Sequence, residues 1–166
     1  MIREGARPDG LVRLWLALLN SLRGIANCYR SEAAFRCEGR HATYVVTGGI
    51  AAPEASVSMT CEGDVPVVEE RRTYEGGHED KRSARISAEA WESVWADFEH
   101  AGWRMVEDCK NPEAGKKDPF YVFEIADDEK QISVTCKGAQ LPFPHDTFRD
   151  ALDRAKGELP VDERAE

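Results

Sequence analysis

The hydrophobic residues of this 166-residue chain change their spacing after Gly39, and this change limits the folds that the chain can adopt. Before Gly39, apolar residues recur every three or four positions, which is typical of one face of an amphipathic helix. After Gly39, apolar and polar residues alternate over short stretches, which is typical of half-buried β-strands. We therefore expect an α+β chain, with a helical start and a β-rich body.

The predicted N-terminal helix follows Pro8 and continues to about residue 38. Within residues 1–50, seven arginines accompany only four carboxylates, although the whole chain carries a formal charge of −9. A basic helix with one apolar face is suited to the surface of an anionic membrane, and an ordinary solvated helix face is the alternative. The apolar residues that we predict to face a membrane are Leu14, Trp15, Leu18 and Leu22.

The body is predicted to hold an antiparallel sheet of about five strands with two helices packed on it. Ser87 is a good cap for one helix, whose apolar stripe ends near Gly102, and Asp146 is a good cap for a second that ends at Gly157. The charged segment 75–85 is predicted to be a loop. The predicted strands lie within residues 43–47, 56–61, 65–74, 120–125 and 131–136.

These patterns divide the chain into three parts. Residues 1–40 form the basic helical segment, residues 41–158 the compact α+β domain, and residues 159–166 a polar tail. The acidic body excludes ordinary nucleic-acid binding, which needs clustered basic residues. No apolar run approaches the ~20 residues that a membrane-spanning helix needs.

The N-terminal residues also have features of an export signal, since Arg3 and Arg7 precede an apolar stretch. Residues 25–28 resemble a lipoprotein cleavage site, but Asn27 occupies a position that requires a small residue. We therefore predict a cytoplasmic protein, with peripheral contact to the inner membrane face as a further expectation. The five cysteines are odd in number and form no CxxC pair, which favours reduced, buried thiols.

Residues with catalytic or metal-binding potential are scattered along the chain. The four histidines have no metal-ligand spacing, so the sequence predicts no metallohydrolase site. Cys109 is followed by Lys110, but no base for it can be identified from the sequence. We predict no catalytic residue and no cofactor for the body of the chain.

One N-terminal motif is specific. Residues 32–36 read Glu-Ala-Ala-Phe-Arg, with Glu38 at a fixed spacing and Gly24 upstream. This segment resembles the amino-terminal motif of prokaryotic diacylglycerol kinase. The resemblance implies that Glu32 helps to bind the divalent ion that accompanies ATP, with Glu38 as the second acid, so Mg²⁺ and ATP would be the cofactors. It covers about residues 10–39, and the second motif of that family is missing from residues 40–166.

The body has a weaker resemblance to the emfourin family, small α+β proteins whose characterised members inhibit thermolysin-type metallopeptidases. It is carried by residues 47–51, the tryptophan-rich helix, residues 118–123 and Leu141-Pro142. The resemblance implies a peptidase partner that is bound through the exposed loop of Gly48, Gly49 and Ile50, and a plain hairpin turn is the alternative.

Two functions therefore follow from the sequence. The first is a non-catalytic protein-interaction domain of the emfourin type, which inhibits a metallopeptidase. The alternative is a member of the diacylglycerol kinase family, incomplete and inactive, in which Glu32 and Glu38 hold the metal ion.

Overall fold

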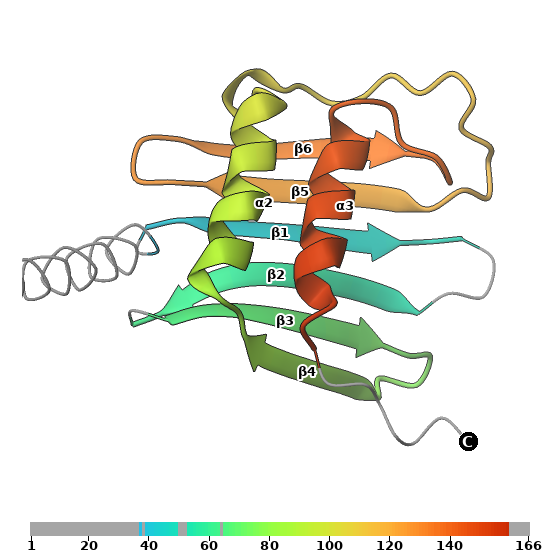
Figure 1. Cartoon of the computed structure of the whole chain (residues 1–166). Helices are drawn as coiled ribbons and strands as arrows, with labels where there is room; N and C mark the ends of the chain where they lie inside the picture. Colours follow the sequence, from blue (N-terminus) through green and yellow to red (C-terminus); the bar gives the residue numbers. More distant parts are fainter. Residues whose placement is uncertain (1–36, 38, 50–52, 64, 160–166) are drawn as a thin grey trace, which may run out of the picture.

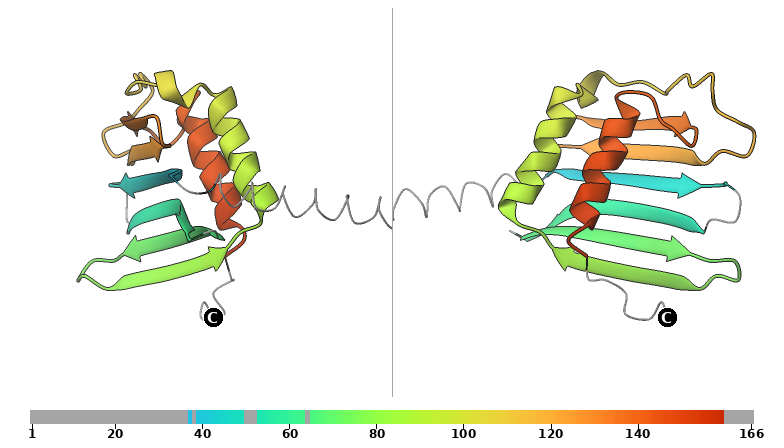
Figure 2. Two further views of the ribbon diagram at one scale, coloured as in Figure 1. Left: turned by 90° about the vertical axis from the view of Figure 1, so that its left-hand side faces the viewer. Right: turned by 45° about the vertical axis from the view of Figure 1, so that its right-hand side comes forward.

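A computed structural model describes residues 37, 39–49, 53–63 and 65–159 of the chain. These residues form two layers, a six-stranded antiparallel sheet and two helices that cover one of its faces (Figures 1 and 2). The elements are β1 (His41–Thr47), β2 (Glu54–Glu62), β3 (Val65–Thr73), β4 (Glu79–Arg85), α2 (Ala88–His100), the short 3₁₀ helix η1 (Trp103–Met105), β5 (Phe120–Ala126), β6 (Gln131–Lys137) and α3 (His145–Lys156).

The strand order is β4-β3-β2-β1-β5-β6, so β1 lies inside the sheet between β2 and β5. Tyr44 of β1 pairs with Val57 of β2 and with Phe123 of β5, and all three side chains are buried. Because alternate side chains point to opposite faces, these residues set the face that the helices cover. The other face carries polar neighbours such as Thr43 and Ser58, as is usual for an antiparallel sheet with one solvated face.

Both predicted helices of the body are confirmed, and they form the second layer. Ser87 caps α2, with its Oγ accepting a hydrogen bond of 3.1 Å from the main-chain N–H of Ala90. For α3 the predicted cap, Asp146, is two residues too late, because the helix begins at His145 and its cap position is Pro144. Rings from the helices and the sheet meet in a continuous aromatic core that includes Trp91, Trp95, Phe98, Trp103, Phe123 and Phe148.

The predicted count of about five strands is wrong, because the sheet has six. The extra strand is β4, which occupies part of the segment that the sequence assigns to a charged loop. β4 is an edge strand that pairs with β3 along its whole length, from Val67 opposite Arg85 to Thr73 opposite Glu79. Its side chains are charged or small and largely solvated, so it lacks the apolar alternation by which the other strands were identified. Charged edge strands of this kind resist pairing with a second molecule.

The predicted N-terminal amphipathic helix falls on residues outside the described part of the chain, so that element of the predicted fold is unsupported. The three-part domain division stays a prediction for the same reason. Among the described residues, no helix is both long enough and apolar enough to cross a membrane.

The prediction of reduced thiols is wrong for the four cysteines that the structure describes, because they form two disulfides. Cys37 is bonded to Cys61 on β2, and Cys109 is bonded to Cys136 on β6. The partners are 24 and 27 residues apart in the sequence, so no short spacing motif marks them. In each pair one cysteine lies in a strand and the other outside the strands, so only the tertiary structure brings the two together.

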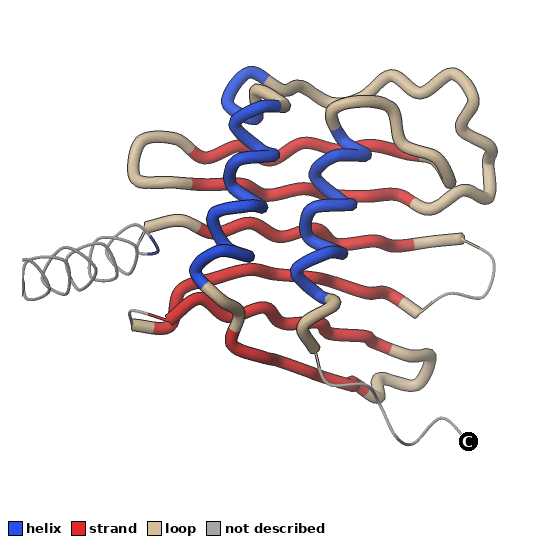
Figure 3. The backbone as a smooth tube through the Cα atoms, viewed as in Figure 1, coloured by secondary structure: helices blue, strands red, loops and turns tan. Residues whose placement is uncertain are grey.

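A long connection without helix or strand joins η1 to β5 and runs beside β6, the other edge of the sheet (Figure 3). Its main chain is attached to that edge at Cys109, whose N–H donates a hydrogen bond of 2.8 Å to the carbonyl of Thr135. Asp108 adds a second contact, since its Oδ1 accepts a hydrogen bond of 2.7 Å from the N–H of Thr135. The disulfide at Cys109 therefore reinforces a segment that already contacts β6.

Candidate functional site

The first candidate site is the diglycine loop, Gly48 and Gly49, which follows β1 at one end of the sheet (Figure 1). Both residues are exposed and have positive φ angles, 76° and 92°, which side chains other than glycine rarely adopt. Among the described residues, a Cβ placed on Gly48 would meet no atom within 4 Å, and one placed on Gly49 would meet only Pro119 at 3.9 Å. The main chain here is therefore open to an approaching partner.

An exposed aromatic residue lies beside the diglycine loop. Phe120 pairs with Thr47, the last residue of β1, and 40% of its surface is exposed. Its neighbour Tyr121 packs against the core, so Phe120 points to the sheet face that the helices leave uncovered. This end of the sheet thus combines an accessible main chain with an apolar side chain, which are two features of protein-binding surfaces.

Most of the other predicted site residues lie outside the described part of the chain. This holds for Ile50 of the predicted partner site and for the kinase-like acids Glu32 and Glu38. It also holds for the predicted membrane-facing residues Leu14, Trp15, Leu18 and Leu22. Their roles stay predictions from the sequence.

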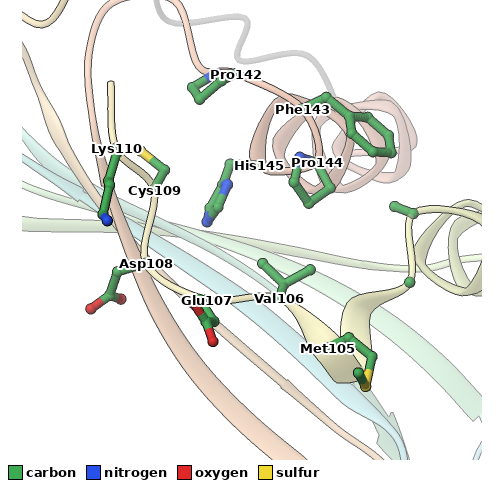
Figure 4. A pocket seen from close by; sticks show the side chains of 12 residues that line it. Met105, Val106, Glu107, Asp108, Cys109, Lys110, Pro142, Phe143, Pro144 and His145 are labelled. Atoms are coloured by element: carbon green, nitrogen blue, oxygen red, sulfur yellow. The ribbon is translucent and has the colours of Figure 1, made fainter. Parts of the chain in front are cut away.

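The second candidate site is the histidine cavity, an open cavity of about 550 Å³ between the η1–β5 connection and the start of α3 (Figure 4). His145, the first residue of α3, lies between Cys109 and Glu107 in this view. Met105 and Phe143 also line the cavity, and 86% and 69% of their respective surfaces are exposed. The cavity therefore has an apolar, solvent-accessible margin and a buried imidazole.

The imidazole of His145 is buried and poorly satisfied. Only 3% of His145 is exposed, and neither ring nitrogen has a hydrogen-bond partner of normal geometry among the described residues. Burial lowers the pKa of His145 below its ordinary value, although the main chain of Glu107 and the carboxylates of Asp108 and Asp146 act to raise it. The ring is therefore neutral at pH 7, with a lone pair on one nitrogen.

The sequence does not reveal the association of His145 with the two cysteines. The ligand atoms of Cys109, Cys136 and His145 all lie within 4.8 Å of one another. They come from a loop, a strand and a helix, so no local spacing marks them. The sequence offered one hint, which is that Cys109 is followed by Lys110. No base for Cys109 could be identified from the sequence, and in the structure His145 lies next to it.

A third group of polar residues is structural. Glu70 on β3 is only 3% exposed, and its carboxylate forms ion pairs with Arg72 at 2.9 Å, with Arg82, and with Lys156 of α3 at 3.6 Å. Burial alone would raise the pKa of Glu70, but the hydrogen bonds from the two arginines and the nearby cations lower it. This carboxylate is fully engaged by three cations and stabilises the contact between the sheet and α3.

No protein-family model matches this sequence, and no curated protein resembles it at a significant level. The function is therefore inferred from the chain's own geometry and from the motifs in its sequence.

Proposed function

We propose that this chain is a non-catalytic protein-interaction domain that inhibits a thermolysin-type metallopeptidase through the diglycine loop. The observation that carries the proposal is the open main chain of Gly48 and Gly49 beside the exposed ring of Phe120. The emfourin-like motifs of the sequence favour this class of partner.

The diglycine loop follows a strand that is paired on both sides. β1 is hydrogen-bonded to β2 on one side and to β5 on the other, and its neighbour β2 is 9 residues long. Because β1 is paired on both sides, the point where Gly48 leaves the sheet is fixed relative to Phe120 of β5. The glycines place no side chain between the partner and the main-chain N–H and C=O groups, which can then bind as an extended peptide would.

The diacylglycerol kinase alternative has no comparable support. It depends on Glu32 and Glu38, both outside the described residues. The buried carboxylate that the structure does describe, Glu70, is engaged by Arg72, Arg82 and Lys156. We therefore keep the kinase function as a prediction from the sequence.

The disulfides bear on where such an inhibitor would act. Disulfides persist mainly in oxidising compartments and are rare in the cytosol. The Cys37–Cys61 and Cys109–Cys136 bonds therefore favour an oxidising compartment over the predicted cytoplasm. Thermolysin-type peptidases that reach such a compartment are the natural targets under this proposal.

An inhibition assay with matched glycine variants tests the proposal. The full chain should inhibit a thermolysin-type peptidase at micromolar concentration, and Gly48→Trp should raise the inhibition constant at least about tenfold, equivalent to about 1.4 kcal/mol. Gly63→Trp is the control, because Gly63 also has a positive φ of 61° and open space around its Cβ position but lies in the β2–β3 turn.

The comparison between the two variants separates binding from folding. Gly63→Trp should inhibit as the unmodified chain does, since its turn lies at the other end of β2. The proposal is wrong if the unmodified chain does not inhibit at micromolar concentration. It is also wrong if both tryptophan variants inhibit equally well.

A further inference from the structure

Two residues that line the histidine cavity, together with a buried cysteine beside them, offer three groups that are suited to one metal ion. Among the described residues, Cys109, Cys136 and His145 are the only set of three or more such side chains whose ligand atoms all lie within 4.8 Å of one another. Each comes from a different element: the η1–β5 connection, β6 and the start of α3. The protein fold, and not a local sequence motif, brings these groups together.

We propose that Cys109, Cys136 and His145 form a zinc site when the disulfide between the two cysteines is reduced. The disulfide is then the metal-free form of the site and the form that an oxidising compartment favours, so zinc binds only where a reductant reaches the chain. This proposal is independent of the inhibitor function, because it involves none of the residues of the diglycine loop.

The state of His145 is the second observation that points to a ligand. His145 is 3% exposed, and in the part of the chain that the structure describes neither ring nitrogen has a hydrogen-bond partner of normal geometry. A buried polar group without a partner is costly, and such groups in native proteins commonly mark a site for an ion or another ligand. A metal ion at the neighbouring sulfurs would give one nitrogen a bonding partner.

The geometry of tetrahedral zinc is compatible with these positions. Zinc binds cysteine sulfur at about 2.3 Å and histidine nitrogen at about 2.0 Å, so two sulfurs of one site lie about 3.8 Å apart. Cys109 lies in a loop, and the Cα atoms of the two cysteines are 4.9 Å apart, so small side-chain rotations can separate the sulfurs once their bond is broken. Cys109 and His145 both line the cavity, which leaves the fourth position accessible to water.

The chemistry of the donor set selects the metal. Two thiolates and one imidazole favour zinc over magnesium or calcium, which prefer oxygen ligands. A dithiol reductant transfers two electrons and two protons to the disulfide, and it leaves as its own disulfide while Cys109 and Cys136 become thiols. Zinc binding then releases one proton from each thiol, and the imidazole donates its lone pair without a proton change.

The second disulfide provides an internal control. Cys37 and Cys61 are joined in the same way, but no histidine or carboxylate completes a set of ligands with them among the described residues. Reduction of Cys37–Cys61 should therefore create no comparable site. Loss of both of these cysteines should leave zinc binding intact.

The test is a metal titration of the full chain after reduction with a phosphine, with Co²⁺ as the probe and Zn²⁺ as the competitor. The reduced chain should bind about one equivalent of Co²⁺ with thiolate-to-cobalt absorption, and Zn²⁺ should displace it. His145→Ala should weaken binding at least about tenfold. Cys37→Ser/Cys61→Ser should bind as tightly as the unmodified chain, and the oxidised chain should show no thiolate-to-cobalt absorption.

A second variant is needed because His145 is buried, so that His145→Ala could lose metal binding through misfolding alone. Cys109→Ser changes a partly exposed loop residue, and it should also weaken binding at least about tenfold while the circular dichroism spectrum stays unchanged. The proposal is overturned if the reduced chain shows no thiolate-to-cobalt absorption. It is equally overturned if Cys109→Ser or a folded His145→Ala binds the metal as tightly as the unmodified chain.

Discussion

The phenolic oxygen of Tyr44 donates a hydrogen bond of 2.6 Å to Oδ1 of Asp153, which joins β1 to α3 across 109 positions of the sequence. Lys156 lies 3.1 Å from the same carboxylate and 3.6 Å from Glu70, so the bond is continuous with the ion pairs on β3. Burial, and then the bond to Asp153, raise the pKa of Tyr44 above its ordinary value of 10. The helix layer is thus attached to the sheet by polar contacts as well as by the aromatic core.

Tyr44→Phe should lower the free energy of unfolding by about 1 kcal/mol, because it removes this hydrogen bond and keeps the ring. The raised pKa adds a pH dependence. The stabilisation from Tyr44 is complete below pH 10 and is lost as the pH rises above that value, where the unfolded chain ionises first. Urea unfolding of the unmodified chain and of Tyr44→Phe, each at pH 7 and at pH 11, measures both effects. The unmodified chain should lose more stability than the variant between the two pH values. An equal loss in the two proteins would contradict the assignment to Tyr44.

Glu70→Gln should lower the free energy of unfolding at pH 7 by about 3 kcal/mol, because it leaves the cations around a buried carboxylate uncompensated. The pKa of Glu70 is lowered in the folded chain, so its stabilisation is present above the ordinary value of 4.5 and is lost as the pH falls below it. The difference from the unmodified chain should therefore shrink in acid.

The neighbouring glutamate provides the control for this experiment. Glu69 pairs with Arg71 and Lys81 on the opposite face of the sheet, and its side chain is 23% exposed. Glu69→Gln should cost less than about 1 kcal/mol, as is usual for ion pairs that water reaches. Equal costs for the two variants would show that burial of Glu70 contributes nothing.

Phe98→Ala should lower the free energy of unfolding by about 3 to 5 kcal/mol. Phe98 is completely buried on α2, and its ring contacts Phe148 of α3 edge to face at 5.4 Å between centroids. Phe143→Ala is the control, because 69% of Phe143 is exposed and its removal should change stability by no more than about 0.5 kcal/mol. Thermal unfolding followed by circular dichroism distinguishes the two.

Cys37→Ser/Cys61→Ser should lower the free energy of unfolding by about 2 to 4 kcal/mol, because the disulfide closes a loop with a sequence separation of 24 residues. The comparison is made by urea unfolding without reductant, so that Cys109–Cys136 stays bonded. Unchanged stability would mean that the strands hold Cys37 and Cys61 together without the covalent bond.

Much of the layer architecture can be predicted from local patterns. The stripe of Trp91, Val94, Trp95 and Phe98 predicts α2, and the alternation in β2 and β6 predicts strands with one buried face. These predictions succeed because a helix or strand that buries one face has apolar residues at a regular spacing along the sequence. β4 was missed for the same reason, since an edge strand with charged and small side chains buries too little for its periodicity to be visible.

The candidate sites divide in a similar way. The diglycine loop could be identified from the sequence, because glycine itself is the signal for positive φ and an open main chain. The exposure of Phe120 beside that loop could not, since it depends on the pairing of β1 with β5. The disulfides and the position of His145 next to Cys109 and Cys136 likewise depend on tertiary structure, because each of these contacts involves a residue that lies outside the strands.

The sequence by itself determined which segments carry an apolar face, where most helices and strands begin and end, and which loop exposes its main chain, because each of these depends on residues close together in the chain. Tertiary structure alone decided the sixth strand, the cysteine pairing, the burial of Glu70 among three cations and the grouping of His145 with two sulfurs. Those features depend on how the strands pair and where the helices pack, which no local pattern of residues records; the two cysteine pairs, for example, join positions 24 and 27 residues apart.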